Sequence, residues 1–187
     1  MYGVKIGIVG LGNVGCHVLY TLALQGIGDE FVLVDKNDKK AAAERQDVFD
    51  SAEFLPHNVK IRLGDYEDLA DCDIIVNSVG RIDLLIGNTD RVAELKFNIP
   101  AVRSYAGRIA ESGFKGYIVN ISNPCDVITN ELIRLIPLPE GHIFGTGTGL
   151  DTARLKAHIA EACNIAPKSI TGYMIGEHGS SQMTPWS

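Results

Sequence analysis

A glycine-rich segment near the N-terminus has the spacing of a phosphate-binding turn. Gly10, Gly12 and Gly15 give the pattern GxGxxG, with Asn13 and Val14 between the last two, directly after an apolar run and before a helical pattern. The glycines allow a tight turn, a close approach of the backbone to a diphosphate, and close packing of helix on strand. The N–H groups and dipole at a helix start favour an anion. We therefore expect this segment to bind the diphosphate of a dinucleotide.

An acidic residue lies at the offset where such a turn needs a ribose-binding group. Asp35 ends the second apolar run, twenty residues after Gly15. A carboxylate there accepts hydrogen bonds from ribose hydroxyls and repels a 2'-phosphate. Alternatively, the glycines form only a turn and Asp35 only caps the next helix, but strand, turn, helix and acid in this order favour a dinucleotide. The expected cofactor is NAD rather than NADP.

Four later segments carry polar residues that the bare fold does not require. They lie at 80–91, 122–124, 150–154 and 176–179. The second, Ser122-Asn123-Pro124, follows an apolar run, and ligands of open α/β sheets bind at the carboxyl ends of strands. Asp151 and Arg154 are three residues apart and so lie on neighbouring faces of a helix. Taken singly, each segment can also be a turn, a helix start or a solvated face.

The elements that must position these residues follow a regular alternation. Short apolar runs at 4–9, 31–34, 59–63, 74–79, 117–121 and 143–144 are separated by segments of helical period. This pattern is typical of a parallel sheet covered by helices on both faces. The run 59–63 alternates apolar and polar residues, which places it near an edge. Right-handed connections then predict a doubly wound sheet.

Helical patterns fill the intervening segments. In the first, Val14, Val18 and Leu22 repeat every four residues and predict one apolar face. Further helices are expected at 39–53, from 90–91 onward, at 125–136 and at 151–163. Pro100 lies inside the third pattern, which predicts a kink or a break there.

Composition excludes several classes of protein. The 187 residues are 45% hydrophobic with a formal net charge of -6. That acidic balance argues against a nucleic-acid partner, and no apolar run approaches the roughly 20 residues that cross a bilayer. Cys16, Cys72, Cys125 and Cys163 form no CxxC pair, so neither a disulfide framework nor a metal site is expected. We expect a soluble, cytoplasmic protein that binds neither nucleic acid nor membrane.

Taken together, these segments resemble the L-lactate and malate dehydrogenase family, and most closely its L-2-hydroxyisocaproate dehydrogenase branch. GLGNVG with Asp35, DRVAELKFN, ISNP, GTGTGLDTAR and GEHGSSQ carry the resemblance over essentially the whole chain. The resemblance implies an α/β protein: a doubly wound parallel Rossmann sheet at 1–149 that binds NAD, then the beginning of an α+β substrate domain at 150–187. It also implies an oxidoreductase that interconverts an L-2-hydroxy acid and its 2-oxo acid, as a homodimer or homotetramer in full-length form.

The same resemblance assigns catalytic and substrate-binding roles. His178 would exchange a proton with the substrate oxygen, a task that imidazole suits because its unperturbed pKa is about 6.5. Asp151 would hold the other ring nitrogen and favour the protonated ring. Arg154 would clamp the substrate carboxylate with two parallel N–H bonds. Arg91, on the long loop, would polarise the substrate carbonyl when the loop closes.

Three further positions belong to the implied cofactor site. Asn123 would hold the substrate carbonyl and the nicotinamide side of the pocket. The family's Asn-Pro bond at this place, here Asn123-Pro124, is usually cis. Gly80 and Asn98 are the remaining implied cofactor contacts.

The family sets its substrate choice largely within the loop 80–91. Counting forward from Gly80 places Asp83 at the discriminating position, and counting back from Arg91 places Leu85 there. Neither is the glutamine of lactate enzymes or the arginine of malate enzymes. Asp83 would repel a second carboxylate, and the apolar residues after it would favour a branched side chain. We expect bulky apolar substrates such as 2-hydroxyisocaproate, or lactate, and Arg81 keeps malate as an alternative.

Family members continue beyond the point where this chain stops. Ser187 lies nine residues past His178, so we expect a truncated parent with an incomplete substrate domain, and one hypothesis is that the chain is too short for full activity. The alternative function is a non-catalytic NAD-binding module. The joint presence of the implied catalytic residues speaks against that alternative.

Overall fold

A six-stranded sheet organises the N-terminal part of the chain in the computed structural model, which describes residues 3–81 and 92–186. The strands are β1 (Lys5–Val9), β2 (Glu30–Val34), β3 (Lys60–Leu63), β4 (Ile74–Asn77), β5 (Tyr117–Asn120) and β6 (Ile143–Gly145). Their order is β3-β2-β1-β4-β5-β6, and the pairs from β3 to β5 are parallel. The run 59–63 therefore lies at an edge, as predicted.

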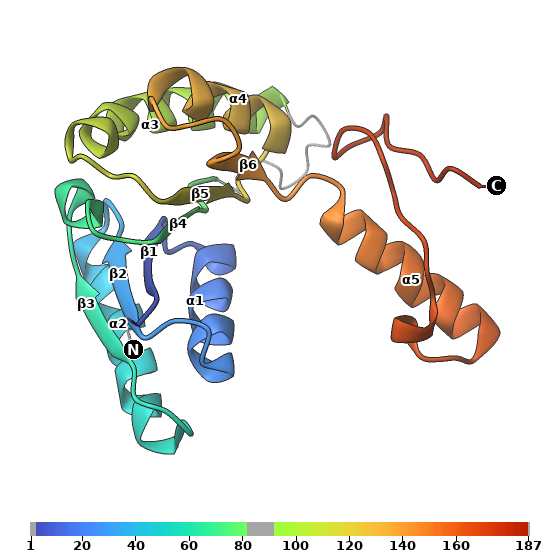
Figure 1. Ribbon diagram of the computed structural model, residues 1–187, viewed down its shortest axis with the longest axis horizontal. Coiled ribbons are helices and arrows are strands. Elements are labelled where there is room, and N and C mark those ends of the chain that lie inside the picture. The colour runs from blue at the N-terminus through green and yellow to red at the C-terminus, as the bar shows by residue number, and fades with distance from the viewer. Residues whose placement is uncertain (1–2, 82–91, 187) are drawn as a thin grey trace. The chain divides into compact units, whose positions relative to one another are not determined.

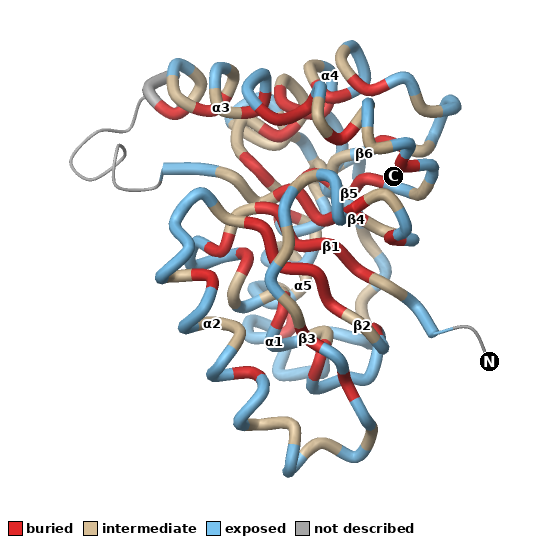
Figure 2. The backbone as a smooth tube through the Cα atoms, turned by 90° about the vertical axis from the view of Figure 1, so that its left-hand side faces the viewer, coloured by how far each residue is buried: buried red, intermediate tan, exposed pale blue. Residues whose placement is uncertain are grey.

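Helices cover both faces of this sheet, which confirms the doubly wound fold (Figure 1). Helices α1 (Asn13–Gln25) and α2 (Asp38–Ser51) lie on one face, and α3 (Val92–Glu111) and α4 (Cys125–Leu135) lie on the other. Successive strand residues point to opposite faces, so Ile8 packs toward the first helix pair and Val9 toward the second. Figure 2 shows the resulting buried stretch along the central strands. The crossover from one helix layer to the other falls between β1 and β4.

The apolar face of α1 differs from the predicted one. Gly15, Leu19 and Ala23 are its buried residues, whereas Val14 is 53% exposed. The prediction is confirmed for Val18 and Leu22, which are partly buried against this core, and is wrong for Val14. A pattern based on apolar size does not show that small residues make the closest approach. A Cβ on Gly15 would lie 2.0 Å from the carbonyl oxygen of Gly10, so the helix approaches the sheet through its smallest residues.

Pro100 does not break α3. The helix runs continuously from Val92 to Glu111 with the proline inside it, so a break is wrong, while the alternative of a kink stays a prediction. A proline removes one backbone hydrogen bond and crowds the carbonyl four residues earlier. Packing offsets this cost, because Val102, Tyr105 and Ile109 of the same helix are almost completely buried against the sheet.

The chain divides into two compact units, Met1–Phe144 and Gly145–Ser187, and each is described by itself. The second begins with α5 (Gly149–Cys163), which ends at Asn164 in a left-handed conformation. The segment after it returns along the helix, with Met174 N–H donating to Thr152 Oγ1 at 3.0 Å. The functional boundary predicted between residues 149 and 150 stays a prediction. Within the described part of the chain, no helix is long and apolar enough to cross a membrane.

Candidate dinucleotide and proton-transfer sites

The glycine turn has the geometry that a diphosphate requires. Gly10 has φ +92, and a Cβ there would lie 2.9 Å from the backbone nitrogen of Val79. Gly12, by contrast, would meet nothing within 4 Å with a Cβ, so its backbone borders open space. The N–H groups in the first turn of α1 have no partners within the helix itself and can bind an anion. Bare backbone at a helix start therefore fits a phosphate group.

Asp35 connects the end of β2 to this turn. Its Oδ2 accepts the Leu11 N–H at 2.6 Å, and its Oδ1 accepts the Asn37 N–H at 2.8 Å. The sequence predicted a partner for ribose hydroxyls but not these two backbone bonds. A carboxylate has about four acceptor positions, so capacity for ribose remains while the turn is held in place.

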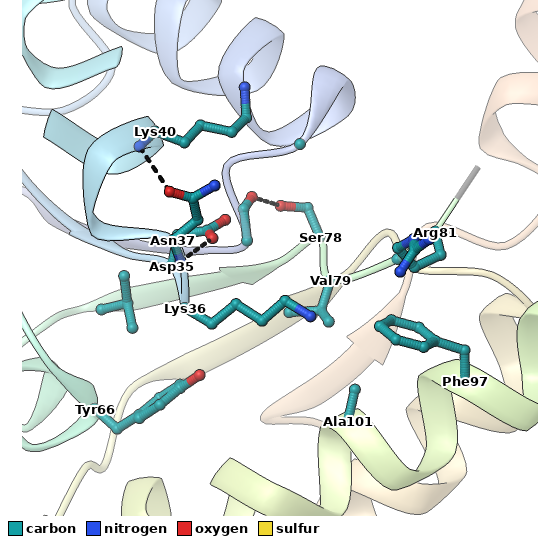
Figure 3. Close-up of a pocket in the computed structure, with 14 residues that line it drawn as sticks. Asp35, Lys36, Asn37, Lys40, Tyr66, Ser78, Val79, Arg81, Phe97 and Ala101 are labelled. Atoms are coloured by element: carbon teal, nitrogen blue, oxygen red, sulfur yellow. Dashed lines mark hydrogen bonds between the residues drawn. The ribbon is translucent and has the colours of Figure 1, made fainter. Parts of the chain in front are cut away.

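Two neighbouring clefts open at the carboxyl ends of the central strands. The first encloses about 230 Å³ and is shown in Figure 3. It is lined by Gly10, Gly12, Val34, Asp35, Lys36, Asn37, Lys40, Tyr66, Ser78, Val79, Gly80, Arg81, Phe97 and Ala101. The second also encloses about 230 Å³ and is lined by Gly12, Asn13, Val14, Ser78, Val79, Gly80, Arg81, Glu94, Ile121, Ser122 and Asn123. Shared walls at Gly12 and Gly80 place the clefts side by side, so one extended ligand can reach both.

Several cleft residues were missed in the sequence. Tyr66 and Phe97 face the first cleft, and the Lys36 ammonium lies 5.1 Å from the centre of the Phe97 ring (Figure 3). Glu94, only 4% exposed, lines the second cleft. Tyr66 could have been found, because it follows the third strand at the same carboxyl edge as Asp35. Phe97 and Glu94 lie within α3, where helical period gives no signal for a cleft.

Asn98 and Asn123 are brought together by α3 and the turn after β5. The Asn98 side chain is fully buried, and its Nδ2 donates to the Asn123 carbonyl oxygen at 2.6 Å. A Cβ added to Gly80 would lie 3.7 Å from the same nitrogen. The Asn123-Pro124 peptide bond is cis. Asn98 therefore holds the backbone of Asn123 and lies near Gly80. Asn123 and Gly80 line the second cleft, but Asn98 is not among the lining residues of either cleft.

His178 and Asp151 form a hydrogen-bonded pair in the second unit. The His178 Nδ1 lies 2.5 Å from the Asp151 Oδ2, across 27 residues of sequence. Their side chains are 12% and 7% exposed. Asp151 stands in the first turn of α5, where the helix dipole favours a negative charge. The segment that follows α5 folds back to bring the imidazole to this carboxylate.

The surroundings of Asp151 keep it ionised. Burial raises the pKa of this carboxyl, but hydrogen bonds from His178 and Gln182 and the charge of Arg154 outweigh burial and lower the pKa below its ordinary value. The Arg154 guanidinium lies 3.7 Å from Asp151 and is 60% exposed. The ionised carboxylate can hold the imidazole through Nδ1 and so fix the direction of Nε2, and the exposed guanidinium can bind a second carboxylate.

Some predicted residues fall outside the described part of the chain. Arg91, Asp83 and Leu85 all lie within 82–91, so their roles stay predictions. Among the described residues, no group of three or more histidine, cysteine, aspartate or glutamate side chains could hold a metal ion.

Comparison with known families decides which proteins share this arrangement. Residues 4–145 match the family described as "lactate/malate dehydrogenase, NAD binding domain". Residues 148–187 match "lactate/malate dehydrogenase, alpha/beta C-terminal domain". The chain belongs to the lactate/malate dehydrogenase family. The predicted family and the predicted cofactor, NAD, are thereby confirmed.

Individual members of the lactate/malate dehydrogenase family are similar over almost the whole chain. The L-lactate dehydrogenase of Fusobacterium nucleatum is 43% identical over 98% of this chain, and L-lactate dehydrogenase 1 of Bifidobacterium longum is 42% identical. Among solved structures, the minor L-lactate dehydrogenase from Enterococcus mundtii has a TM-score of 0.92 at 35% identity. The match covers 98% of this chain and 58% of the Enterococcus chain. A lactate dehydrogenase from a Medee basin deep-sea metagenome library has a TM-score of 0.91 at 33% identity, and the match covers 100% of this chain and 59% of that enzyme's chain. The chain spans 57% of the length of the two bacterial relatives.

Proposed function

We propose that this chain supplies the cofactor-binding and proton-transfer parts of an NAD-dependent dehydrogenase for L-2-hydroxy acids. The observation that carries the proposal is the 2.5 Å contact between His178 Nδ1 and Asp151 Oδ2 in a chain whose N-terminal unit belongs to an NAD-binding family. Cofactor binding is assigned to Met1–Phe144, and proton transfer and carboxylate binding are assigned to Gly145–Ser187.

The two clefts of the first unit divide the cofactor between them. Asp35 and Tyr66 line the first cleft and would hold the adenosine end, whereas Asn123 lines the second and would hold the nicotinamide end. Gly12 borders both clefts and would lie against the diphosphate. NAD, when bound, supplies the hydride chemistry of the reaction. The residues of the chain orient it and hold the substrate.

His178 is the proposed proton donor and acceptor. Its Nδ1 faces the Asp151 carboxylate, so Nε2 is the nitrogen that would exchange a proton with the substrate oxygen. In the reducing direction Nε2 donates to the oxo oxygen, and in the oxidising direction it accepts from the hydroxyl. Asp151, kept ionised, binds Nδ1 and orients the ring.

Arg154 is the proposed binding group for the substrate carboxylate. Its side chain is 60% exposed while one nitrogen stays 3.7 Å from Asp151. A guanidinium can hold a carboxylate through two parallel hydrogen bonds, which fixes the direction of the substrate. Arg91 is proposed to polarise the substrate carbonyl, on the strength of its place in the family motif.

The preferred side chain of the substrate is the most detailed part of the proposal. The relatives named above are L-lactate dehydrogenases, which favours lactate and pyruvate. The sequence of the loop 80–91 favours bulkier, apolar acids such as 2-hydroxyisocaproate and disfavours malate. Comparing kcat/KM for pyruvate, 2-oxoisocaproate and oxaloacetate decides among them, and a clear preference for oxaloacetate would overturn the apolar assignment.

Location and assembly complete the proposal. We include a cytoplasmic location, which the four free cysteines support because thiols persist in a reducing compartment. We also include assembly with identical copies in the full-length form. Sedimentation analysis of the full-length protein at several concentrations tests the second point.

The deciding experiment measures NADH oxidation with 2-oxo acids beside NADH binding by fluorescence. His178→Ala is expected to lower kcat by about 10²–10⁴-fold, the usual contribution of general acid–base catalysis, and to leave NADH affinity unchanged. His158→Ala, at an exposed position on α5, is the matched control and should alter neither quantity. Binding by the unmodified chain without any turnover would instead support a non-catalytic NAD-binding module.

A further inference from the structure

Two buried amide side chains lie at the carboxyl ends of neighbouring strands. Asn77 ends β4 and Asn120 ends β5, and the two are register partners in the sheet. They are 1% and 0% exposed, beside aliphatic residues such as Ile75 and Ile118. Burying an amide is costly unless its hydrogen bonds are made. The hydrogen-bond partners of the two amides therefore indicate which part of the structure they hold in place.

Asn120 is bonded to both ends of the turn that contains Asn123. Its Oδ1 accepts the Ser122 N–H at 3.2 Å, and its Nδ2 donates to the carbonyl oxygens of Ser122 at 3.3 Å and Cys125 at 3.0 Å. The same Nδ2 lies 3.1 Å from Thr129 Oγ1 on α4. One side chain thus fixes the backbone immediately before and after Asn123-Pro124.

Asn77 supports this arrangement from the adjacent strand. Its Nδ2 donates to Asn120 Oδ1 at 2.8 Å and to Ser122 Oγ at 3.2 Å, and its Oδ1 accepts the Tyr105 hydroxyl at 2.5 Å. Tyr105 in turn stacks on Tyr66, with 5.0 Å between ring centres. The Ser122 N–H fixes which end of the Asn120 amide is the oxygen, and the two N–H groups of Asn120 are shared among the oxygens of Ser122, Cys125 and Thr129.

We propose that Asn120 is a positioning residue, which holds the turn 122–125 so that the Asn123 side chain is presented to the second cleft. This inference rests on the proposed function, because it takes that cleft to receive the nicotinamide end of NAD. A purely structural role is the competing explanation. Sheet stability alone does not require amides here, because replacing both partners of a buried hydrogen bond by apolar groups of similar shape can be nearly neutral.

The test compares Asn120→Val with Thr129→Val. Thr129 is also buried, and its hydroxyl lies 3.1 Å from Asn120 Nδ2 and donates to the Cys125 carbonyl oxygen at 2.7 Å. Thr129→Val removes this hydroxyl but leaves the bonds from Asn120 to Ser122 and Cys125 in place. Two quantities are measured in the chain: amide hydrogen exchange at Ser122 without ligand, and dissociation constants for NADH and for AMP. AMP occupies only the adenosine end, so it reports on general damage to the first cleft.

Asn120→Val is expected to speed Ser122 exchange and to weaken NADH binding about tenfold, as for the loss of one ordered hydrogen bond. AMP affinity should stay within about twofold. Thr129→Val should change the affinity for neither NADH nor AMP. If Asn120→Val does not fold, Asn77→Val with Asn120→Val removes both amides together and carries the same expectation.

Unchanged Ser122 exchange, an equal loss of AMP and NADH affinity, or an equal effect of Thr129→Val would overturn the inference. An unsubstituted chain that fails to bind NADH would overturn the proposed function as well, and that failure is visible before any substitution is made.

Discussion

At the scale of single residues, the glycines of the phosphate turn are needed for different physical reasons. Gly15 has no room for a side chain, because a Cβ would lie 2.0 Å from the Gly10 carbonyl oxygen and 2.5 Å from Ser78 Oγ. Gly12 has room, since a Cβ would meet nothing within 4 Å, but that room is the space of the two clefts. Gly15 is therefore needed for folding, whereas we expect Gly12 to be needed for the ligand.

This difference predicts opposite results for two alanine substitutions. Gly15→Ala is expected to lower the free energy of unfolding by about 1–3 kcal/mol, as overpacking in a tight contact does. Gly12→Ala is expected to leave that free energy almost unchanged and to weaken NADH binding, because its methyl group enters the cleft. Thermal unfolding and NADH fluorescence titrations measure both variants. Normal NADH affinity in Gly12→Ala would contradict the assignment of the clefts.

At the scale of elements, α3 carries a proline that costs it a hydrogen bond. Pro100 is exposed and lies four residues after Lys96, whose carbonyl would otherwise accept its N–H. The helix nevertheless stays continuous because its buried face is held against the sheet. A helix whose packing overrides its local sequence should gain stability when the local conflict is removed.

Pro100→Ala is therefore expected to raise the free energy of unfolding. The restored hydrogen bond and the relief of the ring clash should together contribute about 1–3 kcal/mol, up to the usual cost of proline inside a helix. Chemical denaturation of both proteins measures the change. A loss of stability would mean that the proline stabilises a local bend.

An ion-pair cluster joins α3 to α4. Glu131 on α4 contacts Arg103 on α3 at 2.5 Å and Arg134 one turn along its own helix at 2.7 Å. Hydrogen bonds from Arg134 and Arg103 lower the pKa of Glu131 to about 2. A carboxyl with a lowered pKa stabilises the fold above its unfolded pKa, and this contribution disappears as the pH falls through the folded pKa.

Glu131→Gln should consequently change how stability depends on pH. At pH 7 the variant is expected to be less stable by about 1 kcal/mol or less, since both arginines are more than half exposed. The difference should shrink between about pH 4 and pH 2 and vanish below that range. Urea unfolding at several pH values measures it, with Glu140→Gln as an exposed control. A difference that persists at low pH would show that packing, not charge, is lost.

At the scale of the whole molecule, the two proposed sites lie in different units. Both clefts and the entire phosphate turn belong to Met1–Phe144, whereas the His178–Asp151 pair belongs to Gly145–Ser187. The first unit also contains two hydrophobic cores, one on each face of its sheet. A unit with its own cores and its own site should work without the other.

A fragment of residues 1–145, which keeps β6 complete, is therefore expected to fold and bind NADH with an affinity within about threefold of the full chain. It should show no turnover with any 2-oxo acid, because it lacks His178. Circular dichroism and NADH fluorescence test this expectation. A folded fragment that does not bind NADH would place part of the cofactor site in the second unit.

The sequence by itself determined the order of strands and helices, the glycine turn with Asp35, and the family with its cofactor. These features are encoded locally: apolar period, glycine at special backbone positions and acid at a fixed offset act over a few residues. The motif around His178 and the place of Asp151 were also readable. Their contact was only implied, because it joins residues 27 apart.

The tertiary structure alone decided which side of each element matters. It turned Gly15 rather than Val14 toward the sheet, kept α3 continuous through Pro100, and bonded Asn77 to Asn120 across two strands. Local sequence could not show these outcomes, because each depends on what a distant segment presents. A close approach of helix and sheet requires a small residue at the contact. Packing of a buried helix face outweighs the loss of one hydrogen bond, and a buried amide is stable only where a hydrogen-bond partner lies beside it.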